Sequence, residues 1–126
     1  MVRSYISKRV ASFGYAFNGI AAFVKSEAHA KIHVIATLVV IAAGCWYKIT
    51  KVEWLFIILA IAVVFITEML NTTVEKMMDH LSPDYHPNIK FIKDVAAGAV
   101  LIGAIAAAII GAVIFIPYIF PNAINL

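Results

Sequence analysis

The chain has 126 residues, a length typical of one domain. Its hydrophobic share of 63% and mean hydropathy of +0.95 exclude a sizeable soluble domain, because roughly half of the residues of soluble globular proteins are apolar. The formal charge of +3 does not indicate nucleic-acid binding, since the basic residues cluster beside apolar segments. The single cysteine excludes a disulfide within the chain. We therefore expect an all-α membrane protein with one domain over residues 1–126.

The first predicted element is an amphipathic helix over about residues 4–26. Apolar residues recur there in steps of three and four, which is a helical period, and the basic residues Arg3, Lys8, Arg9 and Lys25 accompany them. This pattern is typical of a helix in the membrane interface, with its apolar face toward the lipid. Packing against other helices is an alternative that the pattern leaves open.

Two membrane spans are predicted next. The first covers about residues 32–47 and would be about 24 Å long at about 1.5 Å per residue. That is short for a hydrocarbon core of about 30 Å, so Lys31 and Lys48 would extend to the interfaces. A T-x-x-E capping box at residues 50–53 predicts a sharp start for the second helix, whose span covers about residues 54–79. This helix is longer than a bilayer requires, so its last turns are expected to emerge into water.

The third span is predicted over about residues 93–116. The segment before it, residues 81–88, has two prolines, a serine and an asparagine, which predict a loop. The span itself is rich in alanine and glycine, which allow helices to approach closely. Pro117 and Pro121 are expected to end its helix.

The basic residues predict the orientation of these spans. The N-terminal side and the loop at residues 81–88 share eight of them, and the other side has only Lys48 and Lys51; the eight are Arg3, Lys8, Arg9, Lys25, Lys31, Lys76, Lys90 and Lys93. Because positive residues stay in the cytoplasm, the N-terminus is predicted to lie inside and the C-terminus outside.

An acidic stripe occupies the end of the second span. Its residues are spaced i, i+3, i+4, i+7 and i+11, which places them on one helix face: Glu68, Asn71, Thr72, Glu75 and Asp79. A charge in mid-bilayer costs at least roughly 2.5–3.5 kcal/mol, so such residues usually serve a function. Asp79 alone could mark the point where the helix leaves the membrane. Glu68 and Asn71 lie one or two turns deeper and need another explanation.

The predicted topology brings Glu27, the stripe and the pair Lys93-Asp94 to one cytoplasmic interface. Carboxylates and a lysine suit magnesium-assisted phosphoryl transfer, although no nucleotide-binding glycine loop is present. A proton or ion pathway, as in a small oligomeric channel, and a purely structural polar cluster are the alternatives. A pore needs polar residues along the full depth of a span, whereas residues 105–116 are wholly apolar. This distribution favours the enzyme.

Three sequence blocks carry a resemblance to a known family. They are Glu68-x-x-Asn71-Thr72-x-x-Glu75-x-x-x-Asp79, then Ser82-Pro83-Asp84-Tyr85-His86-Pro87, then Lys93-Asp94-x-Ala96-Ala97-Gly98-Ala99. With them the chain closely resembles the small bacterial integral-membrane lipid kinases, namely the prokaryotic diacylglycerol kinases and undecaprenol kinases. Upstream, Gly14-Tyr15, Gly19, Glu27 and Lys31-Ile32-His33 fit the same family.

The resemblance implies a homotrimer in the bacterial inner or plasma membrane, with active sites shared between subunits and MgATP as the phosphoryl donor. Each subunit would have three spans and the N-terminal surface helix. Glu68 resembles the family's catalytic base, and Glu27 and Glu75 match its magnesium-binding carboxylates. Asn71 and Lys93 match residues that position the phosphates and the transferring group.

The resemblance also implies nucleotide contacts, some of them shared with the catalytic set. The residues that match are Asp79, His86, Lys93 and Asp94, with Tyr15 and either Arg9 or Lys8 from the N-terminal helix; Asp94 counts as catalytic as well. An ordinary interfacial lysine for Lys93 and an ordinary loop histidine for His86 are the alternatives.

The predicted reaction is ATP-dependent phosphorylation of a membrane lipid hydroxyl. Lys31-Ile32-His33 and the Ser-Pro-Asp-Tyr-His-Pro loop resemble the undecaprenol kinase branch more than the diacylglycerol kinase branch. Undecaprenol is therefore the favoured acceptor, and diacylglycerol is next.

Overall fold

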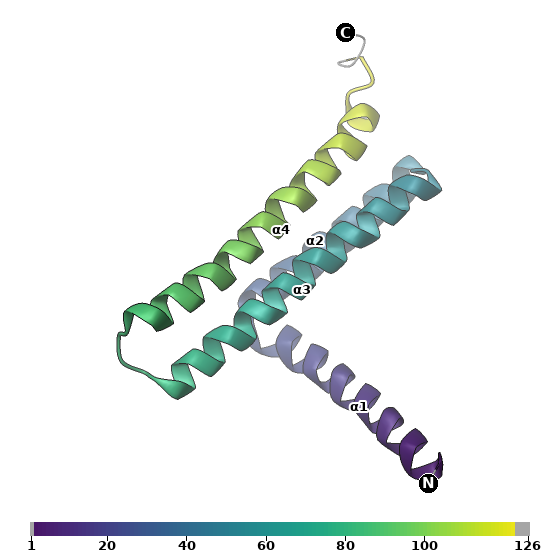
Figure 1. The fold of residues 1–126 in the computed structure, drawn as a ribbon. Helices are drawn as coiled ribbons and strands as arrows, with labels where there is room; N and C mark the ends of the chain where they lie inside the picture. The colour runs from purple at the N-terminus through teal and green to yellow at the C-terminus, as the bar shows by residue number, and fades with distance from the viewer. Residues whose placement is uncertain (1, 123–126) are drawn as a thin grey trace. The chain divides into compact units, whose positions relative to one another are not determined.

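A computed structural model describes residues 2–122, and all regular structure in that range is α-helical. The helices are α1 (Val2–Ser26), α2 (Ala28–Tyr47), α3 (Lys51–Leu81) and α4 (Pro87–Ile119) (Figure 1). The last three are each long and apolar enough to cross a membrane. This confirms the predicted all-α architecture of one N-terminal helix and three long apolar helices. The last residues of the chain, which the predicted topology places outside the cell, lie beyond the described range.

Residues up to 36 form one compact unit and residues from 37 onward form a second. In the first unit, Glu27 alone separates α1 from α2. The backbone N–H of Glu27 donates to the carbonyl of Phe23 (3.1 Å), and the N–H of Lys31 donates to the carbonyl of Glu27 (3.4 Å). Hydrogen bonding thus continues through the break. The apolar residues Phe13 and Phe17 of α1 are exposed.

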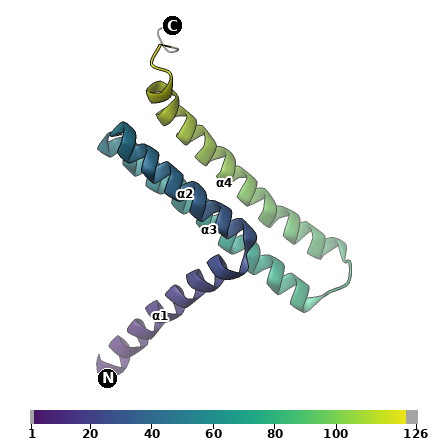
Figure 2. The same cartoon turned by 180° about the vertical axis from the view of Figure 1, so that it is seen from behind.

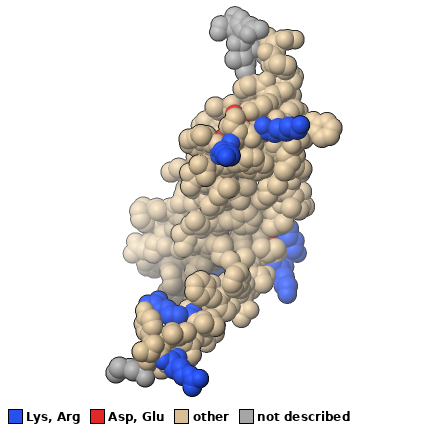
Figure 3. Space-filling view, turned by 90° about the vertical axis from the view of Figure 1, so that its right-hand side faces the viewer, with Lys and Arg blue, Asp and Glu red and all other residues tan. Residues whose placement is uncertain are grey.

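The core of the second unit lies between α3, α4 and the end of α2. Its buried residues are Ile49, Ile57 and Ile114, against which pack Val40, Tyr47, Trp54, Ile61, Ile110, Phe115 and Tyr118. Helices α3 and α4 form a hairpin and lie side by side in both views (Figures 1 and 2). No Asp, Glu, Lys or Arg occurs between Glu53 and Glu68 or after Asp94. On the face seen in Figure 3, the charged side chains accordingly lie away from a wide uncharged surface.

The turn from α2 to α3 is tightly built. Lys48 has a left-handed backbone (φ 52°), and the N–H of Ile49 reaches back to the carbonyl of Gly44 (3.2 Å), as in a Schellman helix end. The predicted capping box is present: Thr50 Oγ1 accepts from the N–H of Glu53 (3.3 Å), and Glu53 Oε2 accepts from the N–H of Thr50 (2.7 Å). Glu53 Oε2 also accepts from the Tyr118 hydroxyl (2.8 Å), which ties the start of α3 to the end of α4.

Two glycines mark close approaches inside this unit. A Cβ added at Gly103 of α4 would lie 3.1 Å from Thr67 Oγ1 and 3.3 Å from a methyl carbon of Val63, both on α3. A Cβ at Gly44 would lie 2.6 Å from the ring of Trp54. Small residues therefore do allow close helix contact, as the alanine- and glycine-rich composition predicts.

Helix α4 differs from its predicted form at both ends. It begins at Pro87, because His86 caps it: the N–H of Asn88 donates to His86 Nδ1 (3.2 Å), and proline fits the first helical position, which has no hydrogen bond to lose. The expectation that Pro117 ends the helix is wrong. Pro117 lies inside α4, which continues to Ile119. Only one backbone donor is lost so close to the end, and the helix tolerates that.

The contact at Gly44 leads to a prediction about stability. Gly44→Ala should lower the free energy of unfolding by about 1–3 kcal/mol, the usual cost of overpacking, because the ring of Trp54 must move. Gly111→Ala is the matched control, since no atom lies within 4 Å of its added Cβ. The control should be neutral or gain up to about 1 kcal/mol from helix propensity. Denaturant unfolding in detergent, followed by circular dichroism, measures both; equal stability of the two variants would contradict the packing.

Candidate functional site

The C-terminal half of α3 carries the predicted acidic stripe on an unbroken helix. Asn71 Nδ2 donates to Glu75 Oε1 (3.4 Å), so these two side chains are neighbours across one turn, as their spacing predicts. Glu68 and Asn71 are half-buried, whereas Glu75 and Asp79 are exposed. Asn71 Oδ1 is buried and has no hydrogen-bond partner among the described residues. The stripe therefore runs from a partly enclosed end at Glu68 to an open end at Asp79.

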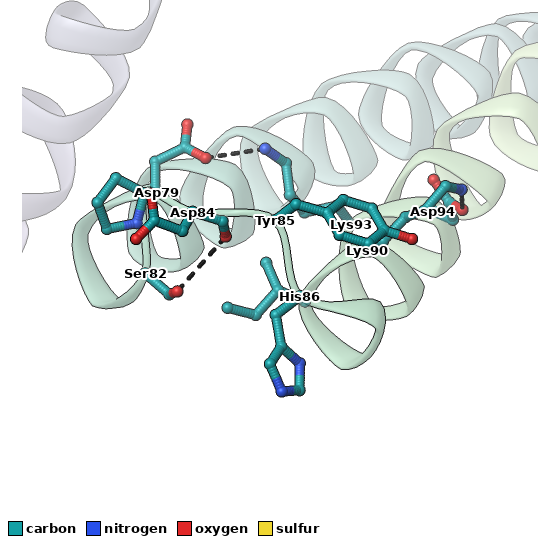
Figure 4. A pocket seen from close by; sticks show the side chains of 10 residues that line it. Asp79, Ser82, Asp84, Tyr85, His86, Lys90, Lys93 and Asp94 are labelled. Atoms are coloured by element: carbon teal, nitrogen blue, oxygen red, sulfur yellow. Dashed lines mark hydrogen bonds and ion pairs between the residues drawn. The ribbon is translucent and has the colours of Figure 1, made fainter.

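A pocket of about 420 Å³ opens beside the exposed end of the stripe (Figure 4). It is formed by the end of α3, the loop at residues 82–86 and the first turns of α4. Its lining residues are Asp79, Ser82, Pro83, Asp84, Tyr85, His86, Ile89, Lys90, Lys93 and Asp94. Its volume falls within the range of small-molecule sites, roughly 300–1,000 Å³. Four predicted site residues are thus brought together: Asp79, His86, Lys93 and Asp94.

An ion pair between Lys93 and Asp79 connects the two helices at this pocket. Lys93 Nζ of α4 donates to Asp79 Oδ1 of α3 at 2.8 Å. Glu75, one turn back on α3, adds a further electrostatic attraction to the Lys93 ammonium. The side chain of Lys93 is 37% exposed and that of Asp79 is 66% exposed. Lys93 is therefore paired with one carboxylate at an open surface, where a ligand can reach it.

The loop between α3 and α4 is held by its own hydrogen bonds. The backbone N–H of Ser82 donates to the carbonyl of Met78 (3.0 Å) and ends α3, and Ser82 Oγ donates to the carbonyl of Asp84 (3.5 Å). His86 Nδ1 accepts the capping bond from Asn88, so the proton of the neutral imidazole lies on Nε2. The helix cap thus fixes the backbone and ring of His86 at the pocket wall.

The remaining predicted residues belong to the first unit. Glu27 Oε1 accepts from Ser26 Oγ (3.3 Å). Arg9 Nη2 donates to the Tyr5 hydroxyl (2.7 Å), and its guanidinium lies 5.0 Å from the centre of the Tyr5 ring. The predicted nucleotide contact Tyr15 is exposed. The predicted roles of Glu27 in magnesium binding and of Arg9 and Tyr15 in nucleotide binding stay predictions.

Lys90 is the main pocket residue that the sequence analysis missed. Its ammonium forms an ion pair with the carboxylate of Asp94 on the pocket wall (Figure 4). Lys90, Lys93 and Asp94 are spaced i, i+3 and i+4, which is one helix face. The spacing was visible in the sequence. The predicted third span begins only near residue 93 and residues 81–88 are predicted as a loop, so the sequence analysis assigns Lys90 no place on this face.

The arrangement supports a specific range of chemistry. Lysine ammonium groups bind phosphate as point charges, and carboxylates are the ligands that Mg²⁺ prefers. The polar face of α3 continues from this pocket toward the uncharged part of the same helix, where lipid is expected. A polar ligand in the pocket and a lipid headgroup beside Glu68 would therefore lie along the same polar face of α3.

Comparison with known proteins identifies the family. The sequence model described as Prokaryotic diacylglycerol kinase matches residues 14–115. The chain is 35% identical over 115 residues to the undecaprenol kinase of Bacillus subtilis (strain 168), covering 91% of this chain and 94% of the relative. It is 35% identical over 107 residues to a diacylglycerol kinase of Synechocystis, covering 84% and 61%. With the diacylglycerol kinase of Escherichia coli (strain K12) it shares 30% over 96 residues, covering 76% and 79%.

These matches define the class of protein to which the fold and pocket belong. The chain is a member of the prokaryotic diacylglycerol kinase family. The resemblance found in the sequence is thereby confirmed. Together with the three helices that can cross a membrane, the family makes this a bacterial membrane protein.

Proposed function

We propose that this lipid kinase transfers the terminal phosphoryl group of ATP to the hydroxyl of a long-chain membrane alcohol. The pocket at the ends of α3 and α4 carries the proposal, because its lysines and carboxylates adjoin the polar face of a membrane helix. Membership of a kinase family implies ATP as the co-substrate. A channel or proton-conducting protein finds no support, since the matched family and the three relatives named above are all kinases.

Undecaprenol is the favoured acceptor, and diacylglycerol is next. The match to the Bacillus subtilis undecaprenol kinase has higher identity and covers more of both chains than the match to the Escherichia coli diacylglycerol kinase. Both alcohols present a primary hydroxyl at the membrane surface, so the same catalytic residues would serve either one.

The nucleotide would bind in the pocket. Lys93 is the proposed cation on its phosphates, since phosphoryl transfer needs a positive charge there. Asp79, His86 and Asp94 are proposed as further contacts because they line the same pocket. Arg9 and Tyr15 are proposed to contribute from the N-terminal unit.

Glu27 and Glu75 are the proposed magnesium ligands. Carboxylate oxygens suit this hard cation, and Glu75 lies in a polar setting beside Asn71. Bound magnesium would offset negative charge on the phosphates. Asn71 is proposed to orient the acceptor or the phosphate, which an amide can do without adding charge.

Glu68 is the proposed general base. It would take the proton of the lipid hydroxyl while the hydroxyl oxygen forms a bond to the terminal phosphorus. The bond from that phosphorus to the bridging oxygen breaks, and ADP leaves with the electron pair. Glu68 lies one turn before Asn71 and is the most deeply placed acid of the stripe. This depth suits a hydroxyl held at headgroup level.

The active assembly is proposed to be a homotrimer with sites shared between subunits. In α4, an added Cβ at Gly98 would have no atom of another element within 4 Å, which leaves room for a neighbouring helix. Native mass spectrometry of the solubilised protein would give the number of subunits.

Purified protein in lipid, incubated with labelled ATP and a panel of long-chain alcohols and diacylglycerols, tests the activity directly. We expect label in undecaprenol first, then in diacylglycerol, and none without magnesium. Heat-denatured protein is the control. Absence of label from every lipid would refute the kinase assignment, and transfer without magnesium would refute the proposed metal dependence.

The excess of basic residues at one side leads to a prediction about orientation. A cysteine at Ser82 should react with an impermeant reagent only from the cytoplasmic side, and one at Asn122 only from the outside. The native Cys45 is replaced first, so that each variant carries one thiol. Labelling of both positions from the same side would contradict three spans.

Glu68→Gln isolates the proposed base. A general base typically contributes about 10²–10⁴-fold, so kcat should fall by a factor in that range. KM for MgATP should change little, because the nucleotide is proposed to bind elsewhere. Steady-state rates with varied MgATP measure both constants, and Lys51→Gln, which removes one charge at the other end of α3, is the control. A tenfold rise in KM with kcat intact would place Glu68 in the nucleotide site instead.

A further inference from the structure

We propose that Lys90 is a second phosphate-binding lysine of the pocket, held by Asp94 until a ligand arrives and then turned toward the ligand's phosphates. The inference rests on the proposed nucleotide site and adds to it a residue that no resemblance assigns. Its basis is the position of Lys90 on α4, the exposure of its ion pair and the charge of the pocket.

The ion pair of Lys90 is open to solvent and easy to exchange. The side chains of Lys90 and Asp94 are 58% and 60% exposed. Exposed pairs of this kind contribute little to stability, because water and salt screen them. A phosphate group can therefore replace the Asp94 carboxylate as the partner of the Lys90 ammonium at small cost.

Helix stability does not explain a lysine at this position. Lys90 lies in the first turns of α4, at the positive end of the helix dipole, where a cation is unfavourable. Its pairing to Asp94 also has the less favourable order, with the cation on the N-terminal side of the acid. The dipole and the order of the pair each lower the stability of the helix. The helix start and the Lys90 ammonium would, however, each attract a bound anion.

Each lysine of the pocket offsets part of the negative charge of its carboxylates, so each one should matter to an anionic ligand. Its lining has three carboxylates, Asp79, Asp84 and Asp94, against two lysines, Lys90 and Lys93, so the lining carries a net charge of −1 with His86 neutral. Without Lys90 the same sum gives −2. A nucleotide polyphosphate is strongly anionic, so the loss of Lys90 should weaken its binding even though Lys93 remains.

Both lysines line the same pocket, so one ligand could contact both. They are spaced i and i+3 on α4, and each is held at the pocket by a different acid (Figure 4). Asp79 on α3 holds Lys93, and Asp94 on α4 holds Lys90. When the phosphates draw Lys90 away, the Asp94 carboxylate also becomes available to the ligand side of the pocket.

The test compares Lys90→Gln, Lys90→Arg and the control Lys51→Gln, which removes a lysine from the far end of α3. Lipid phosphorylation is measured with varied MgATP and varied lipid. Lys90→Gln should raise KM for MgATP about tenfold, which corresponds to the loss of one charge-assisted phosphate contact. The kcat and the KM for lipid should stay within about twofold of the parent values. Lys90→Arg should restore most of the affinity, and Lys51→Gln should match the parent.

A series of competitors separates a phosphate contact from a structural role. Binding of adenosine, AMP and ADP is measured by equilibrium dialysis, which does not depend on turnover. The loss in Lys90→Gln should be absent for adenosine and largest for ADP. An equal loss for all three, a fall in kcat alone, failure of arginine to rescue, or unchanged ADP binding would each overturn the inference. Parent protein that phosphorylates no lipid would refute the proposed function, whereas an active kinase with unchanged Lys90→Gln constants would refute only the role of Lys90.

Discussion

The surplus length of α3 and α4 over a bilayer is the constraint on which the site depends. At about 1.5 Å per residue, the 31 residues of α3 and the 33 of α4 reach about 46 and 50 Å, against a hydrocarbon core of about 30 Å. The hydrogen bond from Tyr118 to Glu53 holds the start of α3 level with the end of α4. Most of the surplus turns therefore gather at the opposite end of the hairpin. At that end the polar side chains can form hydrogen bonds with water or with one another, and the pocket forms there.

Much of this architecture could be predicted from the sequence, because local rules determine it. The capping box at Thr50 and Glu53 is a motif of adjacent residues, and it forms as expected. The contact of Asn71 with Glu75 follows from helical spacing alone. The same local rules gave wrong helix ends at proline, which can either interrupt a helix or fit within one. Proline often breaks a helix, yet Pro87 begins α4 and Pro117 lies within it.

The site was harder to predict, because it depends on contacts between distant parts of the chain. The ion pair of Lys93 with Asp79 joins two helices, and no pattern within either helix specifies it. The predicted topology and the family resemblance placed both residues at one interface, but neither specified the pair. The proposed role of Lys90 was not predicted, because inferring it requires the start of α4 at Pro87 and the ion pair with Asp94. The sequence was thus most informative about each helix and least informative about which side chains meet.

The contacts between α3 and α4 differ along the hairpin in how readily they can rearrange. At Gly103 there is no room for a side chain, because an added Cβ would lie 3.1 Å from Thr67 Oγ1. The Thr67 hydroxyl itself donates to the carbonyl of Val63 (2.9 Å). Such packing has no spare volume and resists displacement. At the pocket end an exposed ion pair and a short loop connect the two helices. Movement of α4 against α3 would therefore require repacking at Gly103, whereas the pocket end could rearrange through a few solvated side chains.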